Sequence, residues 1–114
     1  MSSVETVRCD TVRRLFAAYV AQRPELVDPM LALDFTFSSP RDDHIDRKRY
    51  FEQCWPKGKV FREIHIEHLV ADGDEVIFSY RADKMDGGSF RNVELIRFAS
   101  DRIAEVNVYF GRNI

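Results

Sequence analysis

Apolar side chains recur at steps of three and four residues along positions 4–20, the pattern of an amphipathic helix. The stripe consists of Val4, Val7, Val12, Leu15, Phe16, Tyr19 and Val20. Ser2 and Glu5 have the spacing of a capping box, which satisfies free backbone amides where such a helix begins. Pro24 suits the first turn of a second helix, and Pro29 keeps that helix short or kinks it.

The pattern then changes from helical to alternating. Residues 33–38 alternate apolar and polar side chains, which predicts a half-buried strand. Residues 39–43 have strong turn chemistry. Asp46 can cap a third helix, which we expect to run to Cys54 or Trp55 before Pro56 breaks it.

Four β-rich runs complete the chain, and short turn sequences separate them: residues 60–70, 75–83, 90–98 and 103–110. The predicted order is therefore α-α-β-α-β-β-β-β, with an antiparallel meander last. This order predicts an α+β fold in which helices pack on one face of a curved antiparallel sheet. The length of 114 residues predicts one domain, residues 1–114.

The strand at residues 90–98 is partly apolar on both faces, yet one layer of helices covers only one of them. We therefore expect the face that carries Val93 and Leu95 to meet a second copy of the chain in a homodimer. The alternative is that arginine stems cover these two side chains.

Glu94 lies on the other face of that strand, together with Ile96 and Phe98, where an unpaired carboxylate is costly. Such a group either finds a cationic or hydrogen-bonding partner or has its pKa raised until it is neutral. A neutral carboxylic acid in a cleft donates a hydrogen bond to a ligand oxygen. The structural alternative is an ion pair between Glu94 and an arginine at the mouth of the sheet.

Composition and charge exclude several classes of protein. With 45% hydrophobic and 32% charged residues, the chain is not a disordered or low-complexity segment. A net charge of −2 gives no field that attracts nucleic acid, and no apolar run reaches the ~20 residues that span a bilayer. The first residues lack the features of a secretory signal, so we expect a cytoplasmic protein without nucleic-acid or membrane partners.

Motifs for cofactors and metals are missing. The sequence has no glycine-rich phosphate loop and no Cys-x-x-Cys pair, so we predict no cofactor. His65 and His68 point to opposite faces of a regular strand and His44 lies in a predicted loop, so we predict no metal site. We interpret Cys54 as a small buried apolar side chain rather than a nucleophile.

Three segments carry a resemblance to a known family: residues 15–20, residues 33–40, and residues 92–98 continuing through 101–103 to 108–111. In this order they resemble the nuclear-transport-factor-2-like superfamily, which includes SnoaL-like polyketide cyclases and ketosteroid isomerases. The resemblance implies a cone, a cystatin-like α+β roll, in which the sheet wraps around the long first helix. It also implies an apolar pocket at the open end of the cone.

In ketosteroid isomerases a helical tyrosine and a strand-borne acid bind a developing oxyanion, and a second aspartate moves the proton. By resemblance, Tyr19 and Glu94 match the first two residues and are the candidate catalytic pair. Ser39 stands before Pro40, at the place of the proton-moving aspartate. A serine that has no activating base beside it does not act as a general base near neutral pH. Asp42, Asp43 and His44 either supply a substitute or form a solvated turn.

Further residues are expected to line the pocket: Phe35, Phe37, Ser39, Cys54, Trp55, Phe78, Tyr80, Asn92 and Phe110. The implied function is binding of a small, largely apolar molecule, with cofactor-independent isomerase, cyclase or lyase activity as one form of it. A non-catalytic dimeric binding or accessory domain is the alternative. A protein-interaction module is a third reading.

Overall fold

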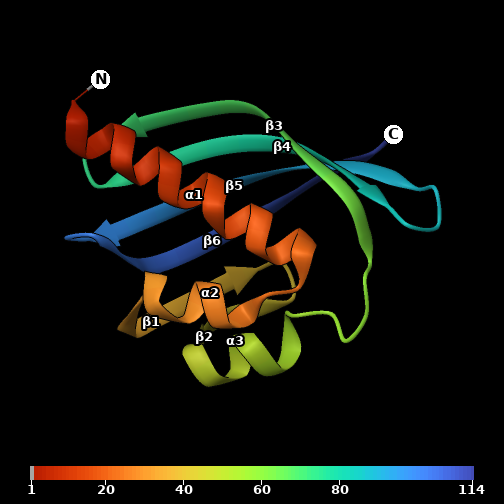
Figure 1. The fold of residues 1–114 in the computed structure, drawn as a ribbon, viewed down its shortest axis with the longest axis horizontal. Helices are drawn as coiled ribbons and strands as arrows, with labels where there is room; N and C mark the ends of the chain where they lie inside the picture. The colour runs from red at the N-terminus through yellow and green to blue at the C-terminus, as the bar shows by residue number, and fades with distance from the viewer. Residues whose placement is uncertain (1) are drawn as a thin grey trace.

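Six strands form one curved sheet in the computed structural model, which describes residues 2–114 (Figure 1). The strands are β1 (Leu31–Ser39), β2 (Asp42–Asp46), β3 (Phe61–Asp72), β4 (Glu75–Lys84), β5 (Ser89–Ala99) and β6 (Arg102–Asn113). The helices are α1 (Ser3–Ala21), α2 (Pro24–Val27) and α3 (Arg47–Gln53), with a 3-10 turn η1 (Asp28–Met30). α1 lies across one face of the sheet, and α2 and α3 lie beside β1 and β2 (Figure 1).

The α+β class and the antiparallel meander β3–β4–β5–β6 are confirmed. The sheet is nevertheless mixed, because its order is β2-β1-β6-β5-β4-β3 and β1 pairs with β6 in parallel. Residues 42–46, predicted as the end of a turn and a loop, form β2, which pairs antiparallel with β1. The turn at Pro40 and Arg41 reverses the chain so tightly that the residues after it continue as a strand.

Both predicted helix caps are confirmed. The Ser2 hydroxyl accepts a hydrogen bond from the Glu5 backbone N–H, and the Glu5 carboxylate accepts one from the Ser2 backbone N–H. The Asp46 carboxylate accepts a hydrogen bond from the backbone N–H of Arg49 at 2.9 Å, so α3 begins where the sequence predicts. These contacts satisfy amides that a helix start leaves unpaired.

The first turns of α1 are held by polar contacts rather than by its apolar stripe. Val4 and Val7, expected to be on the buried stripe, are exposed. Arg8 instead donates to the backbone carbonyls of Gly73 and Ser100, in the β3–β4 and β5–β6 turns. The start of α1 is thereby fixed across the end of the sheet, and the buried residues of the helix begin at Cys9 and continue to Ala18. No helix within residues 2–114 has the length and apolarity needed to cross a bilayer.

Candidate functional site

A cavity of about 180 Å³ lies between the second half of α1, the helix α3 and the inner face of the sheet. Most of its wall is apolar and comes from α1 and the sheet: Leu15, Phe16, Phe37, Phe61, Ile64, Phe90, Val106 and Val108. Five groups with polar atoms complete the wall: Tyr19, Tyr50, Tyr80, Asn92 and Glu94, with the Cys54 thiol beside them. A mainly apolar pocket with a few convergent polar groups is the usual form of a small-molecule site.

Glu94 lies at the centre of a hydrogen-bonded chain on the inner face of the sheet. Tyr80 Oη donates to Glu94 Oε2 at 2.7 Å. Asn92 Nδ2 donates to Tyr80 Oη at 3.2 Å, and Asn92 Oδ1 accepts from the Gly111 backbone N–H at 3.1 Å. Since the Gly111 N–H can only donate, it fixes the orientation of the Asn92 amide. Asn92 in turn fixes the tyrosine proton toward Glu94.

This chain determines what Glu94 can do. Its Oε2 is occupied as an acceptor, so the ligand-facing role falls to Oε1. Burial raises the pKa of Glu94 to about 7, although the hydrogen bond from Tyr80 favours the ionised form. Near neutral pH the carboxyl group therefore exists in both forms. It can donate a proton from Oε1 or accept one there.

Tyr19 lies in the wall of the same cavity but has a structural partner of its own. Its hydroxyl donates to the Cys54 backbone carbonyl at 3.1 Å, which ties α1 to the end of α3. Its ring packs edge-on against Trp55, with 5.0 Å between ring centroids. Burial raises the pKa of Tyr19 to about 12. The hydroxyl oxygen is thus left as an acceptor toward the cavity, whereas Tyr80 provides the partner of Glu94.

The structure brings six of the expected site residues to this cavity: Tyr19, Phe37, Cys54, Tyr80, Asn92 and Glu94. Tyr50, Phe61 and Phe90 also form the wall and were not predicted as pocket residues. Phe90 shares a strand face with Asn92 and Glu94, and this alternation is the signal that could have identified it. Tyr50 is buried in the middle of α3, and its position depends on the path of the chain through β2.

The other five expected residues lie outside the wall. Phe35 and Phe78 are each 1% exposed and fill the core beneath it, and Trp55 is buried behind Tyr19. Ser39 is the last residue of β1, before the turn to β2, and its hydroxyl accepts from the Arg41 backbone N–H. Phe110 is half exposed near the end of β6 and contacts the Arg41 guanidinium. The β1–β2 hairpin carries Ser39 away from the cavity.

The candidate substitutes for Ser39 are also outside the wall. Asp43 and His44 are exposed, and Asp43 Oδ1 lies 2.7 Å from His44 Nδ1. Asp42 begins β2; burial, together with the charge of Asp42, raises the pKa of the Cys54 thiol to about 11. The thiol is therefore protonated at neutral pH, as expected for an apolar wall group. Among the titratable groups of the cavity wall within residues 2–114, Glu94 is the one whose pKa lies near 7.

A second cluster contradicts the reasoning used for the histidines. A bulge between Ile66 and His68 shifts the register of β3, so that His65 pairs with Arg81 and His68 with Ser79. Arg81 and Ser79 lie on the same face of β4, so both histidines face outward rather than to opposite sides. His65 also lies beside two carboxylates, those of Glu63 and Asp83.

Comparison with known proteins gives a consistent result. The sequence profile of the SnoaL-like domain family matches residues 12–106. No curated protein matches the chain. A Jannaschia protein assigned as a SnoaL-like polyketide cyclase superposes with a TM-score of 0.81 at 16% identity, over 95% of this chain and 88% of that one.

Two further solved structures have the same fold. A Kribbella flavida protein assigned as a ketosteroid isomerase gives a TM-score of 0.78 at 20% identity, covering 95% of this chain and 80% of that one. A Mycobacterium tuberculosis LEH-like epoxide hydrolase gives 0.78 at 20% identity, covering 94% and 84%. At these identities the similarity shows a shared fold, and the chemistry has to be argued from the cavity itself.

Proposed function

The chain belongs to the SnoaL-like domain family of the nuclear-transport-factor-2-like superfamily, and from this premise we propose that it binds a compact, largely apolar molecule through one oxygen atom. The observation that carries the proposal is Glu94, a carboxyl group buried in an apolar cavity with one oxygen held by Tyr80 and the other available. Burying such a group is costly unless a partner uses it.

The volume of the cavity limits the size of this ligand. An engineered protein cavity of about 150 Å³ is filled by one benzene molecule. The cavity of about 180 Å³ therefore suits one ring with one or two substituent atoms. A four-ring steroid would have to extend through the opening. The proposed ligand class is a single-ring ketone, aldehyde or enol.

Proton transfer is the reaction that this wall supports. With a pKa of about 7, Glu94 takes a proton from an acidic C–H or O–H of the ligand and returns it at another position. The proton balance closes within the site, so an isomerisation, cyclisation or elimination of this kind requires no cofactor. Ser39 has no part in the step, because it lies at the end of β1, outside the cavity wall.

A non-catalytic binding domain is the second candidate. The observation that favours it is the structural hydrogen bond of Tyr19 to the Cys54 carbonyl, which leaves Glu94 without a second proton donor on the α1 side. Under this proposal Glu94 orients the ligand and no turnover follows. Ligand binding with unchanged ligand after prolonged incubation distinguishes it from the catalytic form.

Cyclohexanone is expected to bind about tenfold more tightly at pH 6 than at pH 8. A group with a pKa of about 7 is about 90% protonated at pH 6 and about 10% at pH 8, and a ketone oxygen requires the protonated form. The measurement is a nuclear magnetic resonance titration at both pH values.

Two matched controls accompany this titration. Methylenecyclohexane has the same shape without the oxygen, so its affinity should be equal at both pH values. Glu94→Gln keeps an N–H donor, so its cyclohexanone affinity should lose the pH dependence. Cyclohexanone binding that is independent of pH in the native chain would contradict the role of Glu94.

A homodimer through the outer face of the sheet is also part of the proposal. Val70, Ile77 and Leu95 form one row across β3, β4 and β5, and Val93 and Tyr109 form a second row across β5 and β6. Four of these five side chains are exposed by 41% to 62%, and the helices cover the opposite face. An apolar patch of this kind, at the centre of a sheet face, is typical of a subunit contact.

Leu95→Glu is expected to convert the dimer into a monomer, because it places two buried carboxylates at the symmetric contact. Analytical ultracentrifugation at micromolar concentrations measures this change. Leu26→Glu is the matched control, since Leu26 is an exposed leucine on α2, away from the sheet face. A native chain that sediments as a monomer across this range would refute the dimer.

A further inference from the structure

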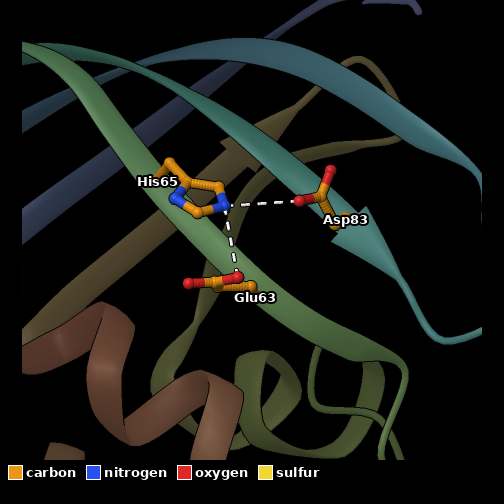
Figure 2. A group of neighbouring side chains, drawn as sticks. All are labelled: Glu63, His65 and Asp83. Carbon is orange, nitrogen blue, oxygen red and sulfur yellow. Dashed lines mark ion pairs between the residues drawn. The ribbon is translucent and has the colours of Figure 1, made fainter.

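Three side chains with metal-binding atoms meet where β3 and β4 pair, on the outer face of the sheet. Figure 2 shows carboxylate oxygens of Glu63 and Asp83 approaching the same ring nitrogen of His65. His65 Nε2 lies 3.4 Å from Glu63 Oε2 and 3.3 Å from Asp83 Oδ2. The three donor atoms lie within 4.8 Å of one another. The cluster is separate from the cavity, whose wall is on the inner face.

Asp83 is held in place by residues outside the cluster. Its Oδ1 accepts hydrogen bonds from the Ser89 hydroxyl at 2.7 Å and from Arg81 Nε at 3.0 Å. Asp83 is only 6% exposed, and its second oxygen, Oδ2, is directed toward His65. Outer contacts of this kind orient metal-ligating carboxylates.

Two carboxylates face each other beside His65. Glu63 and Asp83 are directly opposite each other in the β3–β4 pairing, where two like charges are destabilising. Arg81 compensates Asp83 through Oδ1. The partner that the structure gives Glu63 is His65. A cation placed between the three donors would bind both carboxylates at once.

We propose that Glu63, His65 and Asp83 bind a divalent transition-metal ion of the zinc type. Zinc bonds to nitrogen and oxygen of about 2.0–2.1 Å place neighbouring donors of a tetrahedral site about 3.3–3.5 Å apart. Two edges of the cluster already have these lengths. The Glu63 side chain is 62% exposed and can rotate to close the third edge. Solvent water supplies the fourth ligand.

The donor set also selects among metals. Magnesium and calcium prefer sites made entirely of oxygen, whereas an imidazole nitrogen favours zinc and its neighbours in the transition series. The ion would join β3 to β4 on the side opposite Phe61 and Ile64, which form the cavity wall. Its expected effect is to stabilise this end of the sheet. It takes no part in the proton transfer proposed for Glu94.

Zinc alone is the probe that tests the proposal. Isothermal titration of the chelator-treated full chain with zinc chloride should give one ion per chain and a higher melting temperature. His65→Ala and Glu63→Gln should each weaken binding at least about tenfold, and Ser89→Ala should weaken it by about tenfold because Asp83 loses its orientation. Both replaced ligand residues are exposed, so their variants should remain folded by circular dichroism.

His68→Ala is the matched control, since His68 is exposed on the same face of β3 outside the cluster. Zinc binding that is retained in this variant and lost in His65→Ala supports the site. Three results would overturn it: no zinc binding by the native chain, binding that survives His65→Ala, or equal loss in His65→Ala and His68→Ala.

Discussion

Glu94→Gln is expected to remove about 3 kcal/mol of pH-dependent destabilisation between pH 4.5 and pH 7. Below pH 4.5 the carboxyl is protonated in both the folded and the unfolded chain and does not affect stability. Between pH 4.5 and 7 the unfolded chain ionises while burial keeps folded Glu94 protonated, so the free energy of unfolding falls by about 1.4 kcal/mol per pH unit. Above pH 7 both states are ionised, and the loss persists at its full size.

Urea unfolding at intervals from pH 4 to pH 8 measures this effect as the difference between the native chain and the variant. Asp83 does not interfere, since its lowered pKa costs stability only as the pH falls below about 4. Glu52→Gln, which removes an exposed carboxylate on α3, is the control and should follow the native curve. A Glu94→Gln curve parallel to the native curve would mean that folded Glu94 is ionised at neutral pH.

Gly111→Ala is expected to destabilise the fold by about 1–3 kcal/mol or more, as overpacking of a rigid site does. A Cβ atom at Gly111 would lie 2.1 Å from the Arg91 carbonyl oxygen, and the backbone cannot move away without opening the β5–β6 pairing. The Gly111 N–H also orients Asn92. The variant should therefore lose part of its cyclohexanone affinity as well as stability.

Thermal unfolding and the cyclohexanone titration measure the two effects. Gly58→Ala is the matched control, because a Cβ atom at Gly58 meets nothing within 4 Å. Native stability in Gly111→Ala would show that β5 and β6 separate readily at this end. A stable variant with weakened ligand binding would assign Gly111 to the site alone.

Local signals in the sequence were sufficient for most of the fold. The capping box of Ser2 and Glu5, the cap at Asp46 and the short turns of the meander each depend on residues a few positions apart. β2 was missed because Asp42, Asp43 and His44 have the composition of a turn. The parallel pairing of β1 with β6 joins segments about seventy residues apart, which local patterns do not specify.

In the candidate site, too, the features set by local sequence were predictable and those set by strand register were not. Alternation along β5 was enough to predict that Glu94 faces inward with Ile96 and Phe98, all three now buried. Its partner was not predictable, because Tyr80 reaches Glu94 through the register of β4 against β5. The contacts of Glu63 and His65 with Asp83 depend on register as well, and on a bulge that reverses the expected facing of His68.

The parallel contact between β1 and β6 also determines when the cavity can exist during synthesis. β1 is made early, but the strand that pairs with its inner edge is complete only after residues 102–113 have left the ribosome. Until then β1 and β2 form a two-stranded hairpin, which is marginally stable by itself. Long-range strand pairing of this kind is slow and leaves edges exposed. The nascent chain therefore has an unprotected β1 edge until β6 is made, and ligand binding reports that β6 has docked.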